Sequence, residues 1–178
     1  MPTTAKTKAK NTAERKTRRV QSAKTARKQP DMNALEMLEQ DHREVEELFD
    51  QFDELDDGAE KEEIARKICM MLTVHAQMEE EIFYPAARKA TQDDDLIDEA
   101  VVEHASAKKL IAEIEKMEAG DDLFDAKVRV LGEQVKHHVR EEEDELFPEL
   151  DRIDLDLEEL GAKLAKRKEE LLKKLQAA

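Results

Sequence analysis

Two His-x-x-x-Glu pairs are the residues of this sequence best suited to chemistry: His75 with Glu79, and His138 with Glu142. Residues four apart lie one turn apart on the same face of a helix, so each pair directs an imidazole and a carboxylate to one place. In both cases a proline preceded by an aromatic residue stands ten residues after the histidine. The repetition indicates that the chain contains two related helical hairpins.

Two further histidines, His42 and His104, precede the two pairs by 33 and 34 residues, and an acidic residue stands directly before each, Asp41 and Glu103. On a helical projection all four histidines fall on the apolar face of their helix, and so do the two paired glutamates. Each hairpin therefore contributes two histidines and one glutamate to the core. The residues beside the two pairs are expected to point away from it: Glu80, Glu81, His137 and Glu141.

A buried carboxylate costs several kcal/mol unless it is paired or bound to a metal, and two are expected in this core. No arginine falls on the inward faces, and Lys108 is the one cation nearby. Imidazole nitrogen and carboxylate oxygen are ligands for iron, manganese and zinc, and four histidines with two glutamates suit two ions. We therefore predict two imidazoles for each ion and both glutamates as bridges. The predicted metal ligands are His42, His75, Glu79, His104, His138 and Glu142.

Five helices are predicted to position these residues. They span about 33–56, 60–84, 96–119, 122–148 and 156–176. Asn33 and Glu36 form a capping box at the start of the first helix, and Pro85 is expected to kink or end the second. The links between helices are short, which places neighbouring helices antiparallel. The predicted fold is all-α, an up-down-up-down four-helix bundle with an added C-terminal helix in which Gly161 is a weak point.

The composition agrees with a helical fold. Four glycines, four prolines and six aromatic residues are too few for a turn-rich β-sandwich or barrel. The formal charge is −15, no apolar run approaches the ~18 residues of a membrane span, and the single Cys69 cannot form an internal disulfide. Because no secretory segment stands at the N-terminus, the expected location is the cytoplasm.

The charge divides the chain into parts. Residues 1–30 hold ten basic residues and one acidic residue, a charge of +9, so the rest of the chain carries −24. This segment has too few large apolar residues to fold and is predicted to be a disordered basic tail. We expect it to be solvated; the alternatives are contact with a polyanion (nucleic acid or anionic lipid) and a cleaved transit peptide. Residues 31–150 form the bundle, and 151–178 a C-terminal helix that packs on the bundle or extends it.

Residues 31–150 resemble the hemerythrin-like HHE cation-binding domain family. The resemblance rests on the segments "DHREVEELF", "VHAQMEEEIFYP", "EHASAKKLI" and "VKHHVREEEDELFP", which contain the six predicted ligands. It implies a hemerythrin-like bundle that holds two non-haem iron ions, bridged by carboxylates and an oxo group, that meet O₂ or related small oxidants. By position it makes the four histidines terminal ligands, and Glu79 and Glu142 the bridges. The ligand set itself also tolerates manganese or zinc.

The chain departs from the oxygen-carrying hemerythrins at two positions. They place a second histidine one turn after the third-helix histidine, where this chain has Lys108, and their His-x-x-x-x-Asp on the last helix is His138-x-x-x-Glu142 here. One imidazole fewer leaves the coordination more open, which favours redox reaction or sensing over simple carriage. A ferritin-like site is disfavoured because it needs two Glu-x-x-His pairs, and this chain has one, Glu39 to His42.

Three functions remain open at this stage. The preferred one is a non-haem di-iron protein that binds, senses or stores O₂, NO or iron. The first alternative is a di-iron oxidoreductase that acts on peroxide or O₂. In both cases the partner is a small diatomic or peroxide ligand. The second alternative is a metal-free helical interaction protein whose tail binds a polyanion.

Overall fold

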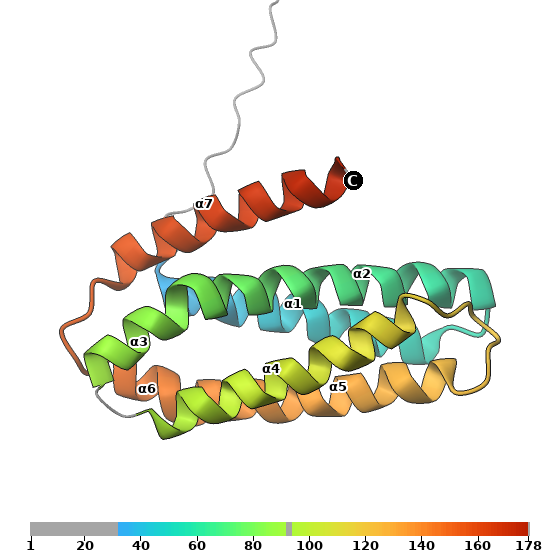
Figure 1. The fold of residues 1–178 in the computed structure, drawn as a ribbon, viewed down its shortest axis with the longest axis horizontal. Helices are drawn as coiled ribbons and strands as arrows, with labels where there is room; N and C mark the ends of the chain where they lie inside the picture. Colours follow the sequence, from blue (N-terminus) through green and yellow to red (C-terminus); the bar gives the residue numbers. More distant parts are fainter. Residues whose placement is uncertain (1–31, 92–93, 178) are drawn as a thin grey trace, which may run out of the picture.

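The computed structural model describes residues 32–91 and 94–177, which form an all-helical bundle (Figure 1). In chain order the helices are α1 Ala34–Glu54, α2 Gly58–Met78, the π-helix η1 Glu79–Phe83, α3 Tyr84–Thr91, α4 Asp95–Ile114, α5 Phe124–Glu141, the π-helix η2 Glu142–Leu146, α6 Phe147–Leu150 and α7 Leu157–Gln176. The four long helices α1, α2, α4 and α5 run alternately up and down, and α7 lies outside them. The predicted four-helix bundle with an added C-terminal helix is confirmed.

The capping box predicted at the start of the first helix is confirmed. The Asn33 side chain accepts a hydrogen bond from the Glu36 amide at 3.1 Å, and the Glu36 carboxylate accepts one from the Asn33 amide at 3.0 Å. Asp57 and Asp156 cap α2 and α7 in the same way through their carboxylates. These caps satisfy amides that have no partner inside the helix, and they fix where each helix enters the bundle.

The two helices that carry the His-x-x-x-Glu pairs continue through their prolines by widening into a π turn. The Tyr84 amide donates to the Glu79 carbonyl, and the Phe147 amide donates to the Glu142 carbonyl, five residues back in each case. Proline has no amide hydrogen, so the carbonyl four residues before it has no partner in α register and the helix relaxes there. Of the two effects expected of Pro85, a kink or an end of the second helix, the end does not occur, because this helix runs on to Thr91.

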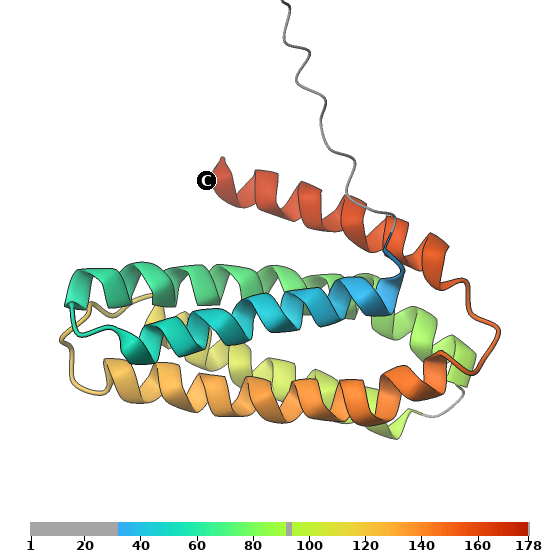
Figure 2. The same cartoon turned by 180° about the vertical axis from the view of Figure 1, so that it is seen from behind.

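The last helix packs against α1, α2 and η1, as the two opposite views show (Figures 1 and 2). Leu160, Leu164 and Leu171 form its buried face. Gly161 lies where two backbones touch, because a Cβ there would stand 2.6 Å from the Met32 carbonyl oxygen. The expected weak point in this helix is thus a close-packing position.

The core consists of two apolar clusters with a polar layer between them. One cluster gathers around Leu38, Met78 and Phe83 at the end of the bundle that α7 covers. The other gathers around Phe52 and Ile68 and their neighbours at the opposite end. His42 on α1 and His104 on α4 fall between residues of the two clusters, and the other predicted ligands have cluster residues on both sides of them in the chain, so apolar side chains enclose all six.

Some predictions fall outside what the structure describes or tests. The basic tail of residues 1–30 lies outside the described residues, and the division into parts at residues 30 and 150 stays a prediction. Within residues 32–91 and 94–177, every helix falls short of the length or the hydropathy that crossing a membrane requires.

Candidate metal centre

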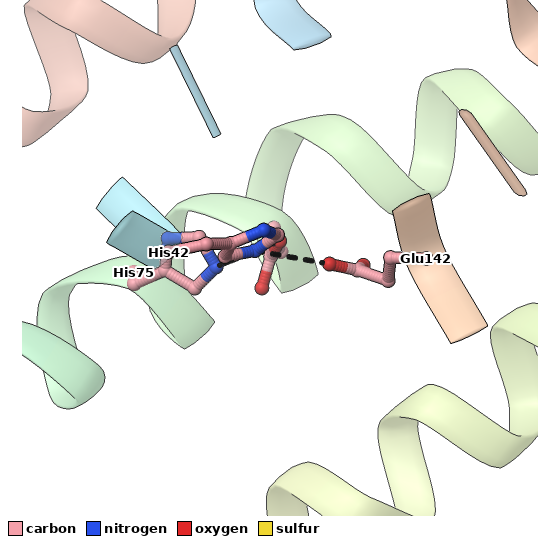
Figure 3. A group of neighbouring side chains, drawn as sticks. His42, His75 and Glu142 are labelled. Carbon is pink, nitrogen blue, oxygen red and sulfur yellow. Dashed lines mark hydrogen bonds and ion pairs between the residues drawn. The ribbon is translucent and has the colours of Figure 1, made fainter. Parts of the chain in front are cut away.

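The structure brings the six predicted ligands together in the middle of the bundle. None of these six residues is more than 8% exposed, and Glu79 is fully buried. The Nε2 atoms of His42 and His75 lie 3.1 Å apart, and those of His104 and His138 also lie 3.1 Å apart. The histidines therefore form two pairs, one from α1 and α2 and one from α4 and α5. Figure 3 shows the first pair with the Glu142 carboxylate directed toward it.

Each buried glutamate joins the two histidine pairs. A Glu79 oxygen lies 3.0 Å from the Nε2 of His75, and its other oxygen lies 3.3 Å from the Nε2 of His104. Glu142 lies 3.3 Å from the Nε2 of His42 and 3.6 Å from that of His138. Each carboxylate thus reaches one imidazole of each pair, which is the arrangement that two bridging carboxylates require.

The buried oxygen atoms between the pairs lack hydrogen-bond donors. Both oxygens of Glu79 and one of Glu142 have no hydrogen-bond partner, although such buried groups are normally satisfied. Two nitrogens bound at about 2.1 Å and at right angles on one ion would stand about 3.0 Å apart, close to the separation within each pair. The donor set and its spacing therefore fit two cations.

A second carboxylate stands behind each imidazole, on the Nδ1 side. The contacts are Glu143 to His42 at 2.8 Å, Glu80 to His104 at 3.0 Å, Glu103 to His138 at 2.9 Å and Asp41 to His75 at 3.6 Å. A carboxylate only accepts hydrogen bonds, so Glu143, Glu80 and Glu103 hold the proton of their imidazole on Nδ1 and leave Nε2 free to face an ion. Asp41 stands too far from the Nδ1 of His75 for a hydrogen bond and acts on it through charge. Two of the four, Asp41 and Glu103, are the acids noted directly before a histidine in the sequence.

The prediction that Glu80 points away from the site is wrong. Glu80 follows directly after Glu79 in η1, and Glu143 follows Glu142 in η2. A π turn closes on the residue five positions on, so each residue rotates less about the axis than in an α-helix. The residue after each buried glutamate therefore stays near the inward face and reaches an imidazole.

On the outer side, a lysine or an arginine pairs with three of these four carboxylates, so that imidazole, carboxylate and cation form a row. Lys108 contacts Glu80 at 2.5 Å, so the lysine that replaces the extra hemerythrin histidine binds a carboxylate. Arg43 pairs with Glu143 in the same way. Lys168, on α7, pairs with the buried Asp41. The C-terminal helix thus contributes directly to the surroundings of the site.

The charges in the site stabilise one another. Burial alone would lower the pKa of His75, but the charge of Glu79 and the contact with Asp41 raise it to about 10. Burial also opposes the charge on His138, whose pKa the carboxylates of Glu142 and Glu103 raise to about 9. Burial favours the neutral acid of Glu79, yet the facing imidazoles hold its pKa well below the usual range. Without a metal, protons on the imidazoles therefore balance the buried carboxylates.

Tyr84 is a site residue that the sequence analysis did not single out. Its hydroxyl donates to Glu142 at 2.9 Å and lies 3.4 Å from the Nε2 of His104. Burial and the charge of Glu142 raise the pKa of this phenol well above its usual value. Phe147 takes the matching place in the second half and stacks on His42 at 6.0 Å. The aromatic residue before each proline was the signal for both.

A small cavity of about 60 Å³ lies beside the four histidines. Apart from the polar groups of the site, its walls are largely aliphatic and include Val45, Leu72, Ile111, Val135 and Val139. A buried water needs roughly 10–15 Å³ of such space, so the cavity has room for a diatomic molecule or a few waters.

The comparisons with known proteins agree with this geometry. The sequence profile described as "Hemerythrin HHE cation binding domain" matches residues 33–150. The fold is similar to the crystal structure of a hemerythrin HHE cation-binding domain-containing protein from Mycobacterium kansasii, with a TM-score of 0.69 and 25% identity over 82% of this chain and 93% of that one. The chain is also 33% identical over 117 residues to a protein of Nostoc sp. (strain PCC 7120) named DNA nickase. That match covers 66% of this chain and 33% of the relative, so this chain spans about a third of the relative's length.

Proposed function

We propose that this chain, which belongs to the hemerythrin HHE cation-binding domain family, holds two iron ions in its core and uses them to bind or sense O₂, NO or peroxide. The observation that carries the proposal is the pair of buried glutamates, each reaching one imidazole of both pairs. Three of their four oxygens lack a hydrogen-bond partner. Removing such atoms from water without compensation costs several kcal/mol, which two cations would offset.

The six predicted ligands would hold the ions, His42 and His75 on one and His104 and His138 on the other, with Glu79 and Glu142 between them. When bound, iron supplies open coordination positions and one-electron chemistry. The outer carboxylates orient the imidazoles, and the aliphatic cavity beside the site admits small molecules while limiting water. Lys108 stands where the oxygen-carrying hemerythrins have a further histidine, and its ammonium group pairs with Glu80. The two ions would therefore share four imidazoles.

Tyr84 favours a second candidate function, a di-iron oxidoreductase that acts on peroxide or O₂. Its buried hydroxyl stands within hydrogen-bond reach of Glu142 and His104. A phenol with a raised pKa keeps its proton at neutral pH and can donate it to an oxygen atom beside it. Reduction of peroxide requires such a proton donor, whereas reversible binding does not.

The name of the Nostoc relative raises the question of DNA cleavage. Two-metal sites cleave phosphodiesters in many nucleases, but there the strand must reach the metals. Here the six residues are at most 8% exposed, behind a cavity of about 60 Å³. A DNA strand does not fit such a site, so we do not assign nicking to this bundle.

Metal analysis of protein expressed with added iron tests the proposal. We expect about two iron ions per chain and visible absorption that changes on adding O₂, NO or peroxide. A reversible change supports binding or sensing. Continuous loss of peroxide supports the oxidoreductase; with no added reductant it is disproportionation, in which one peroxide is reduced to water and a second supplies the two electrons and leaves as O₂. Tyr84→Phe should slow peroxide loss while leaving the iron content unchanged. Well under one metal ion of any kind per chain would contradict both functions.

A further inference from the structure

The row behind His138 differs from the other three. Behind the other imidazoles, each outer carboxylate pairs with a lysine or arginine: Lys168 with Asp41, Arg43 with Glu143, and Lys108 with Glu80. Among the residues that the structure describes, Glu103 has no such cation. Its outer neighbour is His137, an imidazole that is 59% exposed.

Glu103 faces two histidines with its two oxygens. Oε2 accepts a hydrogen bond from the Nδ1 of His138 at 2.9 Å, and Oε1 lies 3.5 Å from the Nε2 of His137. Glu141, one turn after His137 on α5, lies 3.1 Å from the same Nε2 atom. One ligand atom from each of Glu103, His137 and Glu141 therefore lies within 4.8 Å of the other two.

The surroundings of this group are strongly acidic. Glu99 and Glu145 lie close enough to act electrostatically on Glu141, in addition to Glu103. No lysine or arginine pairs with Glu99, Glu141 or Glu145 among the described residues. An imidazole beside carboxylates that have no lysine or arginine partner among the described residues is a set of metal-binding groups.

We propose that Glu103, His137 and Glu141 form an outer site for a divalent transition-metal ion, separate from the six buried ligands. One imidazole and two carboxylates suit zinc, manganese or ferrous iron, and the exposed position leaves room for water to complete the coordination. The ion takes the place that lysine or arginine occupies in the other three rows. Because Glu103 also holds His138, this ion acts on the buried site through a single carboxylate.

Zinc binding tests the outer site whether or not the buried site is filled. The wild type, His137→Ala, Glu141→Gln and the control Lys136→Ala are dialysed against graded Zn²⁺, and the ions per chain are measured. Lys136 is the exposed neighbour of His137 on α5. We expect the wild type and the control to bind one more Zn²⁺ than the other two variants, whose affinity for that ion falls at least tenfold.

Two results would overturn the outer site. Equal zinc binding by all four proteins would show that His137 lies beside Glu103 without binding a metal, or that the extra ion binds elsewhere. A loss in Lys136→Ala as large as that in His137→Ala would reflect a general effect of surface charge. Circular dichroism checks that each variant is folded. Glu79→Ala should lose buried ions but keep the outer one, which separates this site from the proposed function.

Discussion

Loading the metal-free protein with metal at pH 7 should release at least two protons per chain, from His75 and His138. His42 adds a further contribution, because burial would lower its pKa but Glu142 and Glu143 raise it. The pKa values of about 10 for His75 and about 9 for His138 mean that both imidazoles are protonated at pH 7 before metal binds. A protonated Nε2 cannot bind a metal, so each of these histidines must give up its proton first. The same two protons balance the buried carboxylates until the metal replaces them.

The size of the effect follows from those values. At pH 7 the two pKa values lie about three and about two units above the pH, and each unit is worth about 1.36 kcal/mol. Proton competition therefore weakens metal binding at pH 7 by roughly 7 kcal/mol relative to pH 11. The affinity for each ion should rise about tenfold per pH unit between pH 7 and 9, and the overall constant for binding both ions about a hundredfold, with both levelling off above pH 10.

Calorimetric titration with Mn²⁺ in two buffers of different ionisation enthalpy measures the released protons directly. Asp41→Asn removes a charge that raises the pKa of His75, so fewer protons should be released. Asp50→Asn, an exposed position on the same helix, is the matched control and should change nothing. The titration is repeated on His137→Ala to exclude heat from the outer site. Release of no protons at pH 7, or an equal number from Asp41→Asn and the wild type, would refute the reasoning.

Four further outcomes are expected. Glu142→Ala should lose most of the buried metal because it removes a bridge. The control is Glu133→Ala, which changes an exposed glutamate on the preceding helix and should retain the metal; equal loss in both variants would point to nonspecific binding. The metal-free protein should lose thermal stability between pH 7 and 10.5. The raised pKa values of His75 and His138 stabilise the fold at lower pH, and that contribution disappears as the pH passes about 9 to 10; an unchanged melting temperature would contradict this. Gly161→Ala should lower the free energy of unfolding by about 1–3 kcal/mol in chemical denaturation, because the new Cβ meets the backbone of Met32, and a stabilised variant would show that this contact relaxes. Deleting residues 1–30 should leave metal content and helicity unchanged, and a collapse on truncation would show that the predicted boundary is misplaced.

The sequence was most informative where one helix sets the geometry. His75 with Glu79 and His138 with Glu142 share a turn, so their common direction follows from α-helical spacing and needs no knowledge of neighbouring helices. The bundle followed from short links and from the apolar stripes. The structure places all six predicted ligands in the core.

The sequence was less informative where the site depends on irregular turns or on distant elements. Projection at the α-helical angle placed Glu80 outside, because it could not anticipate a π turn that starts at Glu79. Lys168 stands 127 residues after Asp41, and no local pattern indicates that they meet. Gly161 looked like a helix defect, since the backbone it touches belongs to another part of the chain.

The difference between Tyr84 and Phe147 breaks the internal symmetry of the bundle. The two residues occupy equivalent places in the two halves, and each packs on a histidine of the other half. One side of the metal pair therefore faces a hydroxyl and the other a hydrocarbon ring, so the two ions would differ in reduction potential even with equivalent ligands. An incoming molecule with unlike ends, such as nitric oxide or hydroperoxide, would consequently meet a directional pocket with one preferred orientation.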